Sequence, residues 1–117
     1  MSKRILIVDD SLLMRAIIKD SLEKSGYEII GEAATGESAI DIALELNPDV
    51  ITLDNILPDM IGTDILQVYK QENLKSKVIL ISAVGQDSAI EEGMRLGAHA
   101  YIVKPFTTEQ LVEAIEK

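Results

Sequence analysis

Short apolar runs alternate along this chain with longer stretches in which hydrophobic residues recur every three or four positions. Three runs are apolar almost throughout, at residues 5–8, 50–53 and 78–81. Continuous runs of this length are typical of strands buried on both faces of a sheet. Two more strands are expected at 27–33 and 100–103. Glu28 and Glu32 interrupt the first of these, which predicts a position at the edge of the sheet.

The stretches between the runs have the period of amphipathic helices. Five helices are expected, and they follow Ser11, Gly36, Gly62, Ser88 and Thr107. Ser88 with Glu91, and Thr107 with Gln110, have the spacing of capping boxes, in which each side chain bonds to the backbone N–H of the other residue. The last two helices are therefore expected to begin at these pairs.

Five strands that alternate with five helices predict an α/β fold with a parallel sheet covered on both faces. Right-handed crossovers leave few arrangements, and we expect the flavodoxin-like, doubly wound order 2-1-3-4-5. This order places the interrupted second strand at an edge. There is no linker, repeat or low-complexity tract, so residues 1–117 are expected to form a single domain without an output domain.

Composition narrows the class of protein. Hydrophobic residues make up 47% of the chain and charged residues 26%, which favours a compact domain. The absence of cysteine excludes disulfides and thiolate metal sites. A net charge of −9 argues against nucleic-acid binding, which needs a basic face. No apolar run approaches the roughly 20 residues of a membrane span and no signal peptide is present, so we expect a cytoplasmic monomer without membrane contact.

Polar and charged residues follow four of the predicted strands at the point where each strand ends. Asp9 and Asp10 follow the first strand, Asp54 the third, Ser82 the fourth and Lys104 the fifth. Since parallel strands point their carboxyl ends at one edge of a sheet, these side chains are expected to converge there.

Each of these residues also has a purely structural interpretation. Asp10 or Ser11 could cap the first helix, and Lys104 could simply neutralise an aspartate. Their coincidence at four strand ends favours a functional site instead.

The grouping suits phosphoryl transfer to a carboxylate. Three neighbouring carboxylates repel one another, and a divalent cation relieves that repulsion; all-oxygen ligands favour Mg²⁺. Asp54 would be the nucleophile that attacks phosphorus. Lys104 would hold a phosphoryl oxygen and Ser82 would donate a hydrogen bond to the group.

Asp9-Asp10, Asp54, Ser82 and Lys104-Pro105 resemble the acidic pair, the phosphoacceptor, the switch hydroxyl and the lysine of two-component response-regulator receiver domains. The resemblance extends over the whole chain. It implies that Asp10, Asp54 and the backbone carbonyl of Ile56 bind Mg²⁺, with Asp9 assisting through water. It also implies a cis Lys104-Pro105 peptide bond.

Residues 82–86 and 101–106 are most similar to the chemotaxis branch of this family in bacteria and archaea. The resemblance then implies a histidine kinase as the phosphodonor, with Ser82 and Tyr101 as the switch. The output surface would be the fourth helix, fifth strand and fifth helix, which would bind the flagellar switch in bacteria or an adaptor protein in archaea. Catalysis would be limited to the chain's own phosphorylation and dephosphorylation, so an enzyme with an external substrate is not expected.

Two positions depart from the family pattern: Asn55 is polar where members usually have an apolar residue, and Ile56 is apolar where some members are polar. Three other functions compete with a phosphorylation-controlled binding module. An aspartate-nucleophile phosphatase would carry Asp-x-Asp after the first strand, whereas this chain has adjacent Asp9 and Asp10. A carrier of flavin mononucleotide would need a Ser-, Thr- or Gly-rich loop there. A phosphorelay intermediate would share the site and differ only in its partners.

Overall fold

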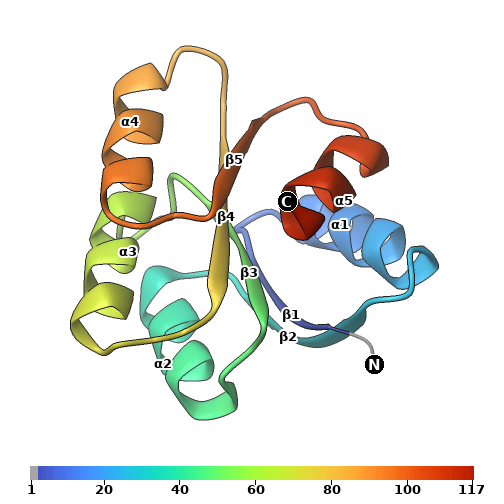
Figure 1. Ribbon diagram of the computed structural model, residues 1–117, viewed down its shortest axis with the longest axis horizontal. Helices are drawn as coiled ribbons and strands as arrows, with labels where there is room; N and C mark the ends of the chain where they lie inside the picture. Colours follow the sequence, from blue (N-terminus) through green and yellow to red (C-terminus); the bar gives the residue numbers. More distant parts are fainter. Residues whose placement is uncertain (1–2) are drawn as a thin grey trace.

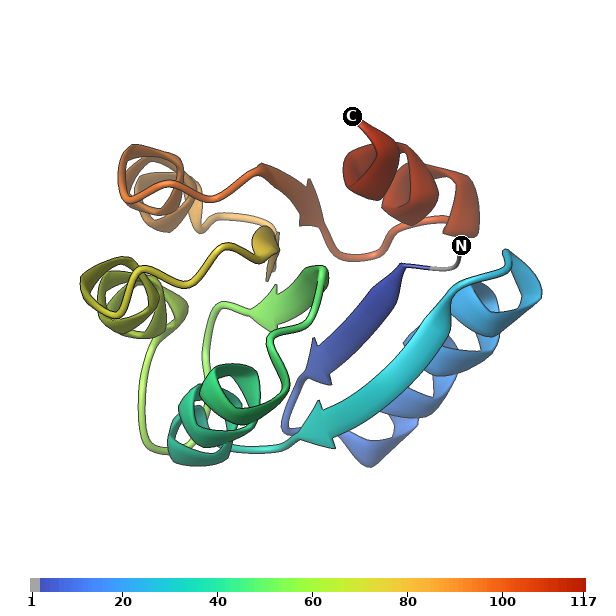
Figure 2. The ribbon, with the colours of Figure 1, turned by 60° about the horizontal axis from the view of Figure 1, so that its bottom comes forward.

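A computed structural model describes residues 3–117 as a five-stranded parallel sheet between two layers of helices (Figure 1). The strand order is β2-β1-β3-β4-β5, which confirms the expected doubly wound fold and places the interrupted strand β2 at an edge. In Figure 2, α1 and α5 lie on one side of the sheet and α2, α3 and α4 on the other. The elements in chain order are β1 (Arg4–Val8), α1 (Leu12–Lys24), β2 (Glu28–Ala33), α2 (Gly36–Leu46), β3 (Val50–Asp54), α3 (Gly62–Gln71), β4 (Lys77–Ser82), α4 (Asp87–Arg95), β5 (Ala100–Val103) and α5 (Thr108–Glu116).

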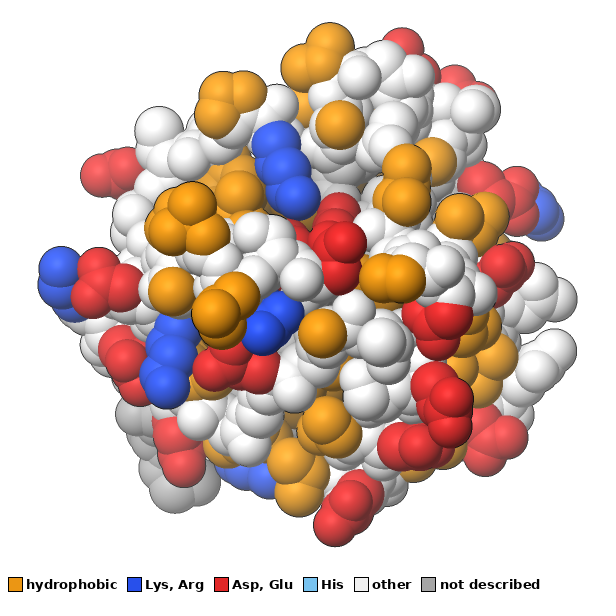
Figure 3. All heavy atoms as spheres, turned by 180° about the vertical axis from the view of Figure 1, so that it is seen from behind, with side chains coloured by type: hydrophobic (Ala, Val, Ile, Leu, Met, Phe, Trp, Pro, Cys, Tyr) orange, Lys and Arg blue, Asp and Glu red, His pale blue; other side chains and the backbone are white. Residues whose placement is uncertain are grey.

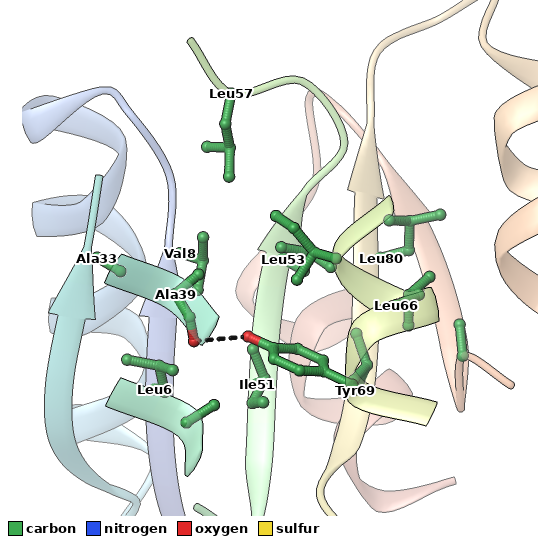
Figure 4. Packing of buried hydrophobic residues seen from close by; sticks show 14 residues of the cluster. Leu6, Val8, Ala33, Ala39, Ile51, Leu53, Leu57, Leu66, Tyr69 and Leu80 are labelled. Carbon is green, nitrogen blue, oxygen red and sulfur yellow. Dashed lines mark hydrogen bonds between the residues drawn. The ribbon is translucent and has the colours of Figure 1, made fainter. Parts of the chain in front are cut away.

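The inner strands divide their side chains between two hydrophobic cores because successive residues of a strand point to opposite faces. In β1, Ile5 and Ile7 pack beneath α1 and α5, whereas Leu6 and Val8 pack beneath α2, α3 and α4. Figure 4 shows the second of these cores, where the hydroxyl of Tyr69 donates to the Ala39 carbonyl at 2.8 Å. The sheet is therefore buried on both faces, as its continuous apolar runs predict.

Three helices, α1, α2 and α5, begin at a residue whose side chain bonds to the first turn. The Ser11 hydroxyl accepts a hydrogen bond from the backbone N–H of Met14 at 3.1 Å and caps α1. At α5, the Thr107 hydroxyl accepts from Gln110 N–H at 3.1 Å, and the Gln110 side chain accepts from Thr107 N–H at 2.8 Å. The predicted capping box at Thr107 is confirmed.

The predicted capping box at Ser88 and Glu91 is wrong. Helix α4 begins at Asp87 with Gln86 as its N-cap, and no side chain bonds to the first turn there. The Gln86 side chain instead accepts a hydrogen bond from Ala83 N–H at 2.7 Å and closes the loop after β4. Ser88 therefore lies inside the first turn, where its hydroxyl cannot occupy the capping position.

Helix α4 lies close to the sheet at Gly93. A Cβ atom at this position would lie 2.6 Å from Cδ2 of Leu80 on β4, well inside van der Waals contact. The absence of a side chain at Gly93 is what permits this approach. Within residues 3–117, no helix is long and apolar enough to cross a membrane.

Candidate functional site

Three aspartates meet at the carboxyl edge of the sheet. Asp9 and Asp10 directly follow β1, and Asp54 is the last residue of β3, the neighbouring strand. One carboxylate oxygen from each lies within 4.8 Å of the others. Asp9 is 1% exposed and Asp54 is 9% exposed, whereas Asp10 faces solvent. Two of the three charges are thus nearly removed from water, where the cost of an unbalanced charge is high.

Lys104 brings the only ammonium group that pairs with this cluster among the described residues. It follows β5, and its Nζ lies 3.3 Å from Oδ2 of Asp9 and 3.5 Å from Oδ1 of Asp54. The peptide bond between Lys104 and Pro105 is cis, as expected. One ammonium against three carboxylates leaves the ionised site with an excess of negative charge.

The pKa of Asp54 reflects this environment. Burial is the largest influence and, together with the negative charge of Asp9, it raises the pKa to about 6 from an ordinary value of 3.8. Lys104 lowers the pKa in part, and Asp10 adds a small increase. Asp54 is therefore a carboxyl group whose ionised form gains from any added positive charge.

The Asp9 segment is held by several hydrogen bonds. Its Oδ1 accepts from Ser11 N–H at 2.9 Å, and its backbone carbonyl accepts from Arg15 Nη1 at 2.7 Å. Arg15 also donates from Nε to Glu32 on β2 at 3.0 Å. Because Ser11 caps α1, the Asp10 carboxylate is not needed for capping and remains at the open side of the site.

The contacts of Arg15 were not predicted from the sequence. Its position on the first turn after the Ser11 cap was the available signal, but its partners are Asp9, which directly follows β1, and Glu32 on β2. Their proximity depends on the path of the chain.

The loop after β3 is tied to the start of α2. Asp59 accepts hydrogen bonds from the backbone N–H groups of Gly36 at 2.7 Å and Glu37 at 3.1 Å, and these bonds hold the pKa of Asp59 below its usual range. A carboxylate is favoured at a helix N-terminus by the unpaired N–H groups and the helix dipole. The contact fixes the loop that carries Ile56, and nothing in the local sequence pointed to it.

Ser82 and Tyr101 occupy neighbouring strands. Ser82 is the last residue of β4; its hydroxyl is fully buried and has no hydrogen-bond partner among the described residues. Tyr101 lies on edge strand β5 and its side chain is 48% exposed. Ile56 lies two residues beyond β3, with a largely exposed side chain.

The donor set of the acidic cluster suits a hard cation. Asp9, Asp10 and Asp54 offer only oxygen atoms, close enough together to share one ion, and Lys104 leaves part of their charge unbalanced. Mg²⁺ and Ca²⁺ are the ions that prefer such ligands. The cluster could therefore hold a divalent metal ion.

Comparison with known proteins identifies a family and several relatives that this chain resembles. The profile of the response regulator receiver domain matches residues 5–116. The chemotaxis protein CheY of Thermotoga maritima is 42% identical over 117 residues, which is 100% of this chain and 98% of that protein. The sporulation initiation phosphotransferase F of Bacillus subtilis is 35% identical, covering 100% of this chain and 94% of its own. The signal receiver domain of the response regulator NarL from Mycobacterium tuberculosis superposes with a TM-score of 0.92 at 28% identity, covering 98% of this chain and 94% of that one.

Proposed function

The chain belongs to the response regulator receiver domain family, and from this premise we propose that it is a phosphorylation-controlled binding module whose phosphoacceptor is Asp54. The observation that carries the proposal is the position of the Asp54 carboxylate. It lies nearly buried at the end of β3, grouped with two other carboxylates and 3.5 Å from the Lys104 ammonium. This is the charge arrangement that a dianionic phosphoryl group requires once a cation is bound.

The proposed donor is the phosphohistidine of a histidine kinase. An Asp54 carboxylate oxygen forms a bond to phosphorus while the bond between phosphorus and the imidazole nitrogen breaks, and the leaving imidazole takes up a proton. Lys104 is placed to neutralise charge on a phosphoryl oxygen during this step. Apart from this reaction and the later hydrolysis of its own acyl phosphate, we propose no catalysis.

The proposed cofactor is Mg²⁺. Asp9, Asp10 and Asp54 would hold it together with the backbone carbonyl of Ile56. When bound, Mg²⁺ supplies positive charge that offsets the carboxylates and the incoming phosphate. The all-oxygen donor set and the unbalanced negative charge of the site support this assignment.

Exposed hydrophobic side chains support a protein as phosphodonor. Leu12 and Leu13 lie at the start of α1, Ile56 and Ile61 in the loop after β3, and Val84 in the loop after β4, and all five are largely exposed. These segments follow β1, β3 and β4, at the edge of the sheet that holds the acidic cluster. Figure 3 shows hydrophobic side chains interspersed with charged ones over one face of the molecule.

The proposed output surface is formed by α4, β5 and α5. Phosphorylation would draw the Ser82 hydroxyl toward the new acceptor oxygens, and Tyr101 on the adjacent strand would move into the space beside β4. A groove of about 380 Å³ already lies between β5 and α5, lined by Tyr101 among others. Its exposed wall supports recognition of a protein partner at this surface.

Similarity to a chemotaxis protein favours a partner in the motility apparatus, such as the flagellar switch or an adaptor protein. Similarity to a sporulation phosphotransferase supports a second candidate, a phosphorelay intermediate. The two differ in the fate of the phosphoryl group. An intermediate would pass it from Asp54 to a histidine of a phosphotransfer protein, whereas a motility regulator would bind its target and then lose phosphate to water.

Intact-mass measurement after incubation with acetyl phosphate and Mg²⁺ tests the phosphoacceptor. We expect one added phosphoryl group on the wild-type chain and none on Asp54→Asn, because an amide lacks the nucleophilic oxygen. Asp64→Asn, an exposed aspartate of α3, is the matched control and should be labelled like wild type. Equal labelling of Asp54→Asn and wild type would contradict the assignment.

A further inference from the structure

Two buried oxygen atoms without hydrogen-bond partners lie at the ends of the neighbouring strands β3 and β4, one on the residue after β3 and one on the last residue of β4. They are Oγ of Ser82 and Oδ1 of Asn55. Residue Ser82 is 0% exposed and residue Asn55 is 5% exposed. In the described part of the chain, the one other buried side-chain oxygen without a hydrogen-bond partner is Oγ1 of Thr52. A buried polar group is costly unless it is hydrogen-bonded, so each of these atoms calls for an explanation.

The strand register places Asn55 opposite Ser82. Leu53 pairs with Leu80 and Asp54 with Ile81, and the backbone N–H of Asn55 continues this ladder by donating to the Ile81 carbonyl at 2.9 Å. Opposed residues of parallel strands project from the same face, and such strands lie about 4.8 Å apart. A serine hydroxyl and an asparagine amide together span that gap with one hydrogen bond.

The Asn55 amide lies on the face of the sheet opposite to the one from which Asp54 projects. Leu53 and Leu80, which precede the pair by two residues, pack in the core beneath α2, α3 and α4. A Cβ atom at Gly62, the first residue of α3, would lie 3.2 Å from Oδ1 of Asn55. The amide is therefore directed at the start of α3, and it can reach Ser82 without approaching the acidic cluster.

We propose that Asn55 is a positioning residue for Ser82: in the unphosphorylated protein its amide bonds to the Ser82 hydroxyl and competes with the phosphoryl group for it. This inference rests on the proposed function. A rotation of either side chain satisfies both buried oxygens with one bond, which favours that arrangement over the two unpaired groups. An apolar residue at position 55 would leave the hydroxyl with the phosphoryl group as its one strong acceptor. Asn55 therefore stabilises the resting state against activation.

Titration with beryllofluoride, a phosphoryl mimic that binds a carboxylate, tests the competition in the presence of Mg²⁺. Binding is followed by the NMR signal of the Ser82 backbone amide in wild type and in Asn55→Leu. Because the mimic no longer has to displace a hydrogen bond, we expect its apparent Kd to fall about three- to tenfold in Asn55→Leu. The same substitution in a Ser82→Ala background should leave the Kd unchanged, since the hydroxyl for which the amide and the mimic compete is already absent.

Thr52→Val is the matched control, because it also removes a buried, unpaired side-chain oxygen from β3, on the opposite face of the sheet. It should leave the Kd unchanged. Asn55→Ala provides a second variant if Asn55→Leu does not give a folded spectrum, and the same direction of change is expected.

An unchanged Kd in folded Asn55→Leu or Asn55→Ala would overturn the inference, as would an equal fall in the Ser82→Ala background. Either result would leave the proposed function standing, because the wild type would still bind the mimic. Absence of binding to wild type would overturn the proposed function and this inference with it.

Discussion

At the scale of single residues, the chemistry of the site depends on where Asp54 stands. Its carboxylate is nearly buried, and this burial together with the charges of Asp9 and Asp10 acts against its ionisation more strongly than Lys104 supports it. The burial and the neighbouring carboxylates that make the ionised Asp54 costly in the folded protein also favour the binding of a cation beside it. Stability and reactivity are therefore coupled at this residue.

This coupling predicts a pH dependence of stability in the absence of divalent metal. The pKa of Asp54 is about 6 in the folded protein and near 3.8 when unfolded, so between these pH values the folded state binds more protons. The free energy of unfolding should therefore fall as pH rises through this window. Because Asp54→Asn lacks this titrating carboxyl group, its free energy of unfolding should exceed that of wild type by about 1–3 kcal/mol at pH 7 and by much less at pH 4.

Urea denaturation of both proteins in a chelator, at half-unit steps from pH 4 to pH 7.5, measures the difference. Groups that titrate in both proteins, such as Asp59 and Glu116, cancel in the comparison. A difference that stays constant with pH would mean that Asp54 is not the group responsible.

At the scale of elements, two helices that share a sequence signature begin in different ways. Helix α5 uses the Thr107 capping box, whereas α4 has a Ser-x-x-Glu sequence but begins without a side-chain cap. The difference arises in the loop after β4, where Gln86 bonds to Ala83 and takes the capping position. The start of α4 is thus less strongly fixed than that of α5, which suits its place in the proposed output surface.

Alanine substitution tests this contrast. Thr107→Ala removes a hydroxyl that satisfies an unpaired N–H of the first turn, and should lower the free energy of unfolding by about 1 kcal/mol. Ser88→Ala removes an exposed hydroxyl that does not cap a helix, and should change the free energy of unfolding by less than about 0.5 kcal/mol. Equilibrium urea unfolding of the two variants beside wild type gives both values. Equal losses would show that Ser88 caps α4 in solution.

At the scale of the whole molecule, a net charge of −9 and a partly buried acidic cluster both act against the compact state. A cation that binds the folded cluster and not the unfolded chain must stabilise the fold by mass action. The acidic edge of the sheet therefore links metal binding to global stability.

Addition of Mg²⁺ should accordingly raise the free energy of unfolding of wild type, by about 2.7 kcal/mol at a concentration one hundred times the Kd. Asp10→Ala should lose most of this gain, because Mg²⁺ tolerates little loss of carboxylate ligands. Asp41→Ala, which removes an exposed aspartate of α2, should retain it. Thermal unfolding at increasing Mg²⁺ concentrations compares the three. A full gain in Asp10→Ala would indicate that this carboxylate does not hold the metal.

The sequence by itself determined the elements, their order and the residues that meet at the edge of the sheet. Apolar runs and helical periods are local patterns, and hydrophobic burial enforces them wherever the chain folds. Since all five strands are parallel, the residues that end them must lie at one edge. For this reason the sequence alone predicts that Asp9, Asp10, Asp54 and Lys104 lie close together.

Only the tertiary structure decided the contacts that hold the site and tune it. Arg15 reaches the Asp9 segment, Asp59 reaches the start of α2, and Asn55 stands opposite Ser82. Arg15 also joins the Asp9 segment to Glu32 on β2, and the other two pairings join segments that are distant in sequence through a particular loop path or strand register. Neither the residue types nor the hydrophobic period predicts which of these segments lie next to each other. The burial that raises the pKa of Asp54 likewise arises only when the helices pack on the sheet.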